Sequence, residues 1–213
     1  QKKETLAIGG NSLISFDSIE IISRKNKKLI NIKQIKNLRK SLREKINFDI
    51  TNIVKTKTFK KLKLSNLPIL MGVINITPDS FSDGGKYYKT NSAIERANHF
   101  VSKGCKIIDV GGESTRPGAK EISVKSEWKR MENFFKKAKK LKCLISLDTR
   151  KSKIMELASK YKVDLVNDVS GLNYDEMTPK IIKEYNCHYV LMHSIKTPNT
   201  MQLNPIYKNV VVD

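Results

Sequence analysis

Two segments of the chain carry side chains that can bind polar or charged ligands. The first, residues 71–85, reads MGVINITPDSFSDGG and contains three carboxylate or amide groups, one phenylalanine and a glycine pair. The second, residues 107–118, reads IIDVGGESTRPG and leaves an apolar run through two glycines, which let the backbone approach a ligand closely. Because a guanidinium beside hydroxyl groups offers several donors to phosphate oxygens, this second segment predicts an anion-binding loop.

Polar residues also follow each short β-branched run of the chain. These runs predict strands over 69–75, 106–110, 144–148, 164–167 and 188–192. In barrels and open parallel sheets, ligands bind at the carboxyl ends of the strands. A capping or turn role explains any one of these polar residues, but the whole set predicts a shared site. Its members are Asn75, Asp109 with Gly111 and Gly112, Asp148, Asn167 with Asp168, and His193.

Amphipathic helices are predicted between these strands. Three cover residues 91–103, 124–141 and 151–161, and a fourth begins at Thr178 and Pro179. The first buries its apolar positions on one face and stops at Gly104, a common helix terminator. Strands that alternate with helices in this way are typical of an α/β fold built on a parallel sheet.

The N-terminal part of the chain differs from the rest in charge. Residues 1–68 hold 17 Lys or Arg against 5 Asp or Glu, which is more than half of the net charge of +20. Strands are predicted over 5–8 and 18–23, and the apolar residues between Ile32 and Ile46 recur at three- and four-residue steps, which predicts a helix. A non-catalytic module that binds RNA or a partner through residues 1–57 is one interpretation. We favour solvated basic faces and expect no nucleic-acid binding.

Composition places the chain among soluble globular proteins. It is 39% hydrophobic, and no stretch approaches the roughly 18 consecutive apolar residues of a membrane helix. The three cysteines are far apart and suggest neither a disulfide framework nor a zinc site. We therefore expect a cytoplasmic protein with no membrane partner.

The two loop segments resemble the two signature regions of dihydropteroate synthases. The runs SLDT (146–149), VNDVSG (166–171) and VLMH (190–193) resemble later strands of that family in the same order, so the resemblance extends over 59–213. It implies a (β/α)8 TIM barrel that is incomplete in this chain, with about the first five βα units, preceded by a small basic α+β segment. The implied domains are 1–57, which could be the tail of an upstream fused domain, and 58–213, the pterin-binding domain.

The implied activity belongs to folate biosynthesis. A dihydropteroate synthase condenses 6-hydroxymethyl-7,8-dihydropterin pyrophosphate with p-aminobenzoate to give 7,8-dihydropteroate and pyrophosphate. Asp148 and Asn167 would hold the pterin, since its ring edge presents adjacent N–H donors that a carboxylate accepts in pairs. Asp148 would also be catalytic, because its charge stabilises positive charge that develops on the pterin. The pterin pyrophosphate would contact Thr115, Asp148, Asn167, Val169 and Met192.

The resemblance also implies roles for loop residues and for Mg²⁺. Arg116 would be the second catalytic residue, because it stabilises the departing pyrophosphate together with Mg²⁺. Asn75 would be a metal ligand, and one amide oxygen suffices because Mg²⁺ takes other ligands from water and substrate phosphates. No general base is needed for a neutral aromatic amine, so we interpret His193 as a strand-end polar group. The loops around p-aminobenzoate would contribute Phe81, Asp83, Ser114, Arg116 and Pro117.

Several expectations concern the protein as a whole. We found no counterpart of the family's later elements, including an aspartate in a glycine- and phenylalanine-rich segment and a lysine in a Ser-Arg-Lys run. We therefore expect a fragment of a longer gene product, inactive alone, rather than a degraded remnant. The full-length protein would be a homodimer and, as a member of this family, a sulfonamide target, with fusion to a pathway pyrophosphokinase an open alternative. A methyltetrahydrofolate-binding methyltransferase barrel is the competing enzyme class, but it has no use for the anion-binding loop at 114–116.

Overall fold

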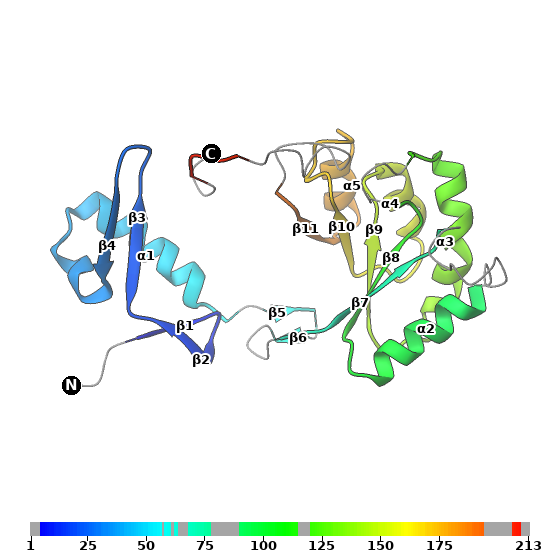
Figure 1. Ribbon diagram of the computed structural model, residues 1–213, viewed down its shortest axis with the longest axis horizontal. Helices are drawn as coiled ribbons and strands as arrows, with labels where there is room; N and C mark the ends of the chain where they lie inside the picture. Colours follow the sequence, from blue (N-terminus) through cyan, green and yellow to red (C-terminus); the bar gives the residue numbers. More distant parts are fainter. Residues whose placement is uncertain are drawn as a thin grey trace. The chain divides into compact units, whose positions relative to one another are not determined.

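The computed structural model divides the chain into two compact units (Figure 1). One unit consists of Gln1–Ile69 with Ile206–Asp213, and the other of Leu70–Pro205. The structure describes residues 5–56, 58–60, 62–63, 68–77, 90–114, 120–193 and 206–209. Within these ranges, no helix is both long and apolar enough to cross a membrane.

The first unit has a small core between antiparallel hairpins and helices. Its buried residues are Ile30, Ile35 and Ile46, which pack with partly buried isoleucines and leucines. The strands pair as β1 with β2, β3 with β4 and β5 with β6. The elements are β1 (Leu6–Ile8), β2 (Asn11–Phe16), β3 (Ser18–Ile22), β4 (Lys27–Asn31), the 3-10 helix η1 (Ile32–Asn37), α1 (Lys40–Val54), β5 (Thr58–Phe59) and β6 (Leu62–Lys63).

The single helix predicted from Ile32 to Ile46 is wrong, because the structure divides this stretch into η1 and α1. Asn31 caps η1 in a capping box with Gln34, and the backbone is extended at Leu38 before α1 begins. The apolar periodicity continues across the break, since residues of both helices pack into the same cluster. Periodicity alone therefore could not reveal it.

The second unit is a five-stranded parallel sheet with helices between consecutive strands (Figure 1). The strand order β11-β10-β9-β8-β7 follows the chain without a crossover to the other edge. This sequential order is that of one side of a (β/α)8 barrel, and it confirms the predicted fold class. The elements are β7 (Met71–Asn75), α2 (Thr90–Ser102), β8 (Ile107–Gly111), α3 (Val124–Ala138), β9 (Leu144–Asp148), α4 (Ser152–Ala158), β10 (Leu165–Asp168), α5 (Thr178–Glu184) and β11 (His188–Leu191).

The two faces of this sheet have different surroundings. One face carries apolar side chains that pack against the helices in a single core, among them Ile74, Val110, Leu147 and Val166, all at most 1% exposed. Because side chains alternate along a strand, the residues just before and after these point to the opposite face. That opposite face carries the polar strand-end residues.

Candidate active site

The carboxyl ends of four strands bring three polar side chains into one row. Asn75 pairs with Gly111, Gly111 with Asp148, and Asp148 with Asn167. Adjacent strands lie about 4.8 Å apart, so the Asp148 and Asn167 side chains are neighbours on the same face. Gly111, which has no side chain, separates Asp148 from Asn75. The structure therefore brings together three residues that the sequence predicted for one site.

Gly111 leaves room for the carboxylate of Asp148. A Cβ atom added at Gly111 would stand 3.0 Å from Oδ2 of Asp148 and 3.3 Å from its Cβ. Such contacts are tighter than side chains normally tolerate, so this position favours glycine for reasons of space. The glycine thus permits the Asp148 side chain to lie over β8.

Burial and neighbouring negative charges raise the pKa of Asp148 from 3.8 to about 7. Burial is the largest cause, and the carboxylates of Asp109, Glu127, Asp168 and Glu113 follow. A carboxyl group that titrates near neutral pH can be protonated in the free protein. Once ionised, it can accept a hydrogen bond from an N–H group of a ligand. Perturbed carboxyl groups of this kind are characteristic of functional sites.

Asp109, which the sequence placed among the strand-end polar residues without assigning it a substrate contact, is a member of the site. It lies inside β8 and is 3% exposed, and its Oδ2 accepts a hydrogen bond of 3.0 Å from Nδ2 of Asn167. Burial raises its pKa, while the side chains of Ser146 and Asn167 lower it in part. The sequence does indicate this placement, because Asp109 lies two residues before Gly111. Side chains alternate along a strand, so both positions lie on the same face of the sheet.

The two apolar pterin-contact residues predicted from the sequence follow adjacent strands. Val169 comes directly after β10 and Met192 directly after β11, and both are partly buried. The turn after β10 approaches the end of β11 closely, because a Cβ at Gly171 would stand 2.2 Å from the carbonyl oxygen of Met192. Gly171 also has a φ of +57°, a conformation that favours glycine.

Asp168 holds this turn in place. Its Oδ1 accepts a hydrogen bond of 2.7 Å from the backbone N–H of Ser170, and its Oδ2 accepts one of 2.6 Å from the Tyr189 hydroxyl. Its side chain is fully buried. Asp168 is therefore a structural support of the strand ends, which agrees with the turn role considered from the sequence.

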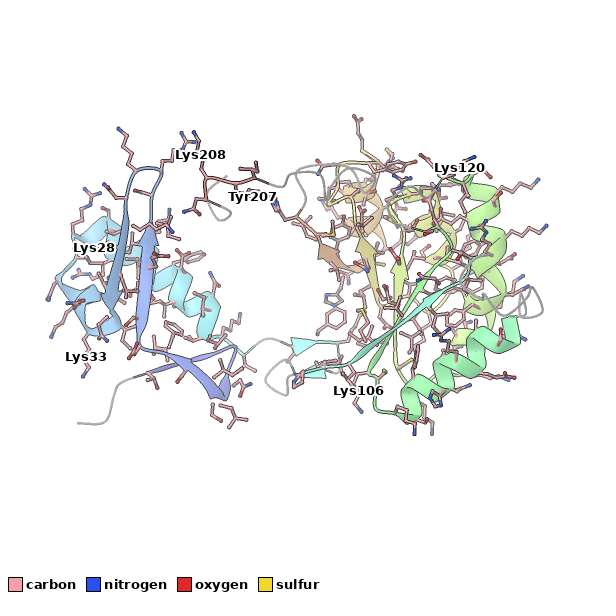
Figure 2. All side chains as sticks on the ribbon, in the orientation of Figure 1. Lys28, Lys33, Lys106, Lys120, Tyr207 and Lys208 are labelled. Atoms are coloured by element: carbon pink, nitrogen blue, oxygen red, sulfur yellow. The ribbon has the colours of Figure 1, made fainter. Side chains whose placement is uncertain are left out.

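The remaining predicted site residues belong to the two loops. Ser114 follows β8 and is partly buried, and His193 is exposed after β11. Lys106, just before β8, and Lys120, a few residues before α3, lie on opposite edges of the unit (Figure 2). Phe81, Asp83, Thr115, Arg116 and Pro117 lie outside the described residues.

Asn75 fits a magnesium site as a single oxygen ligand. It ends β7 on the polar face, in the same row as Asp148. Among the described residues, no group of three or more His, Cys, Asp or Glu side chains could hold a metal ion. The oxygen donor at this strand end suits a hard cation that takes its other ligands from water and a substrate.

The site can therefore recognise a planar heterocycle with adjacent N–H donors. Asp148 supplies a carboxylate, Asn167 an amide beside it, and Val169 and Met192 apolar surface from adjacent strands. Hydrogen bonds to an ionised carboxylate contribute about 1.5–3 kcal/mol each. These groups lie at the end of a parallel sheet where βα proteins bind ligands.

Comparison with known proteins gives a consistent result. The pterin binding enzyme family matches residues 71–213. Dihydropteroate synthase of Neisseria meningitidis serogroup B is 41% identical over 146 residues, which are 68% of this chain and 51% of the relative. The chain thus spans about half the length of the curated relatives that it matches.

Solved structures show the same partial coverage. Dihydropteroate synthase of Yersinia pestis in a sulfonamide drug complex has a TM-score of 0.65 and 33% identity, with 73% of this chain and 57% of that one covered. The enzyme of Clostridium difficile, solved in the presence of pteroic acid, has a TM-score of 0.58 and 42% identity, with 61% and 49% covered. The five-stranded unit is therefore part of a TIM barrel.

Proposed function

Because the chain belongs to the pterin binding enzyme family, we propose that it binds 6-hydroxymethyl-7,8-dihydropterin pyrophosphate as part of a dihydropteroate synthase. The reaction joins this pterin to p-aminobenzoate and releases pyrophosphate. The observation that carries the proposal is the pairing of Asp148 with Asn167 at the carboxyl ends of β9 and β10. The printed names of the relatives support it, and the activity is proposed for the protein as a whole.

Asp148 has two tasks in this mechanism. Its ionised carboxylate accepts N–H donors from the aminopyrimidinone edge of the pterin. As pyrophosphate leaves the methylene carbon, the same negative charge stabilises the positive charge that spreads over the ring. Binding of a donor-rich ligand favours the ionised form, so the pterin lowers the pKa of Asp148 from its value of about 7 in the free protein.

The loop residues act on the other substrate groups. Arg116 and Thr115, with Ser114, bind the pyrophosphate, and Arg116 stabilises it as it departs. Phe81, Asp83 and Pro117 contribute to the p-aminobenzoate site. Mg²⁺, with Asn75 as one ligand, supplies positive charge to the phosphate oxygens when it is bound. A sulfonamide would compete with p-aminobenzoate for this site.

Two further proposals concern the assembled protein. A homodimer and a cytoplasmic location are expected from the family resemblance and from composition. Sedimentation of the full-length gene product would test the first, and a monomer at micromolar concentration would contradict it. Both proposals are independent of the pterin site.

Calorimetry tests the pterin assignment directly. We expect the pterin pyrophosphate, titrated with Mg²⁺ present, to bind the wild-type chain and to bind Asp148→Asn at least about tenfold more weakly, the loss of one charge-assisted interaction. Glu156→Gln, a change at a partly exposed side chain in the same unit, is the matched control. Equal affinity of wild type and Asp148→Asn would refute the proposed contact.

Turnover separates the two enzyme classes. Formation of 7,8-dihydropteroate from the pterin pyrophosphate and p-aminobenzoate supports a synthase. Methyl transfer from methyltetrahydrofolate to cobalamin would support the methyltransferase alternative instead. The assay is best performed on the full-length gene product, because the matched relatives are about twice as long as the region they share with this chain.

A further inference from the structure

A buried cluster of charges lies next to the turn that follows β9, the strand that ends at Asp148. The ammonium group of Lys151 contacts Oε2 of Glu127 at 2.8 Å and Oε2 of Glu113 at 3.1 Å. It also donates a hydrogen bond of 2.6 Å to the carbonyl oxygen of Ile122. The three charged side chains are at most 8% exposed, and Glu127 is fully buried.

The carboxylates of this cluster make further bonds to the backbone and side chains around them. Oε1 of Glu127 accepts a hydrogen bond of 2.7 Å from the hydroxyl of Thr149, the residue after Asp148. Oε1 of Glu113 accepts one of 3.0 Å from the backbone N–H of Ile122. Arg150 adds an ion pair of 3.4 Å to Glu113. Each carboxylate oxygen of the cluster thus has a partner.

These contacts join three places along the chain. Glu113 follows the end of β8, Ile122 is where the chain returns toward α3, and Thr149 and Lys151 form the turn after β9. Lys151 therefore ties both ends of the 114–121 segment to the turn that begins at Asp148. The cluster therefore links the chain just after β8 and the start of α3 to the turn after β9.

Stability alone does not account for such a cluster. Moving charged groups out of water is costly, and replacing a buried ion pair by apolar side chains is often neutral or stabilising. A cluster that contains two carboxylates and one ammonium, and that lies one residue from a proposed binding group, is better explained by a requirement for geometry.

We propose that Lys151 is a positioning residue of the pterin site. Through Glu113 and Glu127 it holds the chain at the ends of β8 and β9, so that the Asp148 carboxylate faces the ligand in the geometry that binding needs. Lys151 itself does not touch the pterin. The inference rests on the proposed function, because it assigns a role in placing the residues of that same site.

Lys151 also pairs with two of the carboxylates that raise the pKa of Asp148. Asp148 faces Asp109 from β8, Asp168 from β10, Glu113 from the segment after β8 and Glu127 from α3, and all four raise its pKa in addition to burial. Lys151 places a positive charge between Glu113 and Glu127, with Arg150 beside Glu113. Removing the ammonium takes away the cation that pairs with Glu127 and leaves Glu113 paired with Arg150 alone, which shifts the ionisation of Asp148 to higher pH.

The test compares Lys151→Met with the double variant Glu127→Gln/Lys151→Met in the full chain. Calorimetry with the pterin pyrophosphate and Mg²⁺ gives the affinity at several pH values, and circular dichroism shows whether each variant folds. Lys153→Met is the matched control, since Lys153 lies two residues away, is 59% exposed and pairs only with Glu156 among the described residues. Thr149→Val, which is isosteric and changes no charge, is a milder probe of the same cluster.

We expect Lys151→Met to bind the pterin pyrophosphate roughly tenfold or more weakly and its affinity to rise at higher pH than in wild type. The double variant removes one carboxylate with the ammonium, so its pH midpoint returns toward that of wild type while its affinity stays low. Lys153→Met changes neither quantity. A purely structural role would lower affinity equally at every pH, without a shift of the midpoint.

Two results would overturn the proposal. If Lys151→Met folds and binds with the wild-type affinity and pH midpoint, Lys151 positions nothing. If the lysine variants do not fold, the affinity of Thr149→Val for the pterin pyrophosphate is the test. A wild-type affinity in that variant would contradict the inference. Wild-type protein that fails to bind the pterin pyrophosphate at all would instead refute the proposed function, and this inference with it.

Discussion

The carboxamide nitrogen of Asn167 in β10 donates a 3.0 Å hydrogen bond to Oδ2 of Asp109 in β8, across the strand β9 that lies between them. A carboxylate can only accept hydrogen bonds, so it selects the orientation of the amide and turns the oxygen of Asn167 away from Asp109. That oxygen is then available to an N–H donor of a ligand. Asp109 thereby decides which atom of Asn167 faces the site.

Replacing this carboxylate by an amide should weaken pterin binding. In Asp109→Asn the new side chain has the same shape but can donate as well as accept, so the amide of Asn167 is no longer held in one orientation. We expect an affinity loss of about tenfold, or about 1.4 kcal/mol, measured by calorimetry with the pterin pyrophosphate. Because the change also removes a buried negative charge that raises the pKa of Asp148, the comparison belongs at pH 8, where Asp148 is mostly ionised in both proteins. Undiminished affinity there would contradict the orienting role.

The affinity for the pterin should depend on pH through the ionisation of Asp148. Its pKa is about 7 in the free protein, mainly because of burial, and the proposed contact needs the carboxylate. Below pH 7 the group must lose a proton before it binds, so affinity should fall by about tenfold per pH unit. Calorimetry between about pH 5.5 and 8.5, roughly one and a half units on either side of the midpoint, checks this. A flat profile in wild type, equal to that of Asp148→Asn, would exclude Asp148 as the titrating contact.

The same group should make folding stability fall as the pH rises. The carboxyl of Asp148 has a pKa of 3.8 in an unfolded chain and about 7 when folded, so the folded state holds the extra proton between these values. Stability from this group is complete below pH 3.8 and is lost as the pH approaches and passes about 7. Asp148→Asn cannot lose a proton, and it should be more stable than wild type above pH 7. Urea unfolding followed by the fluorescence of Trp128, the one tryptophan of the sequence, measures the difference.

If Asp148→Asn is not more stable than wild type at about pH 8, burial does not oppose the negative charge of Asp148. Asp175→Asn is a useful comparison. Although burial raises its pKa, hydrogen bonds from Ser152 and Met177 lower it overall. Removing that carboxylate should therefore destabilise the protein near neutral pH, opposite to Asp148→Asn.

The two glycines at the end of β8, Gly111 and Gly112, should respond differently to alanine. At Gly111 the new Cβ would stand 3.0 Å from Oδ2 of Asp148, so Gly111→Ala should displace the carboxylate and weaken pterin binding about tenfold or more. At Gly112 the Cβ would stand 2.9 Å from the backbone oxygen of Glu127 in α3, so Gly112→Ala should lower the free energy of unfolding by about 1–3 kcal/mol. Calorimetry and urea unfolding on both variants check the contrast. Equal effects of the two substitutions on affinity, after correction for folded fraction, would contradict it.

The sequence predicted the strand ends well because two patterns agreed there. Short β-branched runs alternate with amphipathic helices, and parallel strands placed in that order bring their carboxyl ends to one edge. Asn75, Asp148 and Asn167 could therefore be assigned to one row before any coordinates were known. Strand alternation also predicts that Asp109 lies on the polar face of the sheet. Its hydrogen bond to Asn167 could not be predicted, because it depends on the conformations of both side chains and not on their spacing in the sequence.

Other features had no local signal. Lys151 is one of 41 lysines and arginines in the sequence, and its carboxylate partners are 24 and 38 residues away. Its burial follows from the packing of α3 against the end of β9, not from its neighbours in sequence. The break between η1 and α1 was missed for a related reason, since apolar periodicity reports burial and does not report a local change of backbone conformation.

The hydroxyl of Tyr189 should stabilise the fold through Asp168. The hydroxyl donates a 2.6 Å hydrogen bond to the fully buried carboxylate, which also accepts the backbone N–H of Ser170. Burial and this bond to Asp168 raise the pKa of Tyr189, so the hydroxyl keeps its proton at neutral pH. In Tyr189→Phe, Oδ2 of the buried Asp168 carboxylate loses the hydrogen bond that the hydroxyl donates. The substitution should therefore lower the free energy of unfolding by about 1.5–3 kcal/mol.

Tyr185→Phe, at a tyrosine that is 40% exposed, is the matched control and should change stability by less than about 0.5 kcal/mol. Urea unfolding with Trp128 fluorescence measures both, and equal stabilities would mean that the buried carboxylate does not depend on Tyr189.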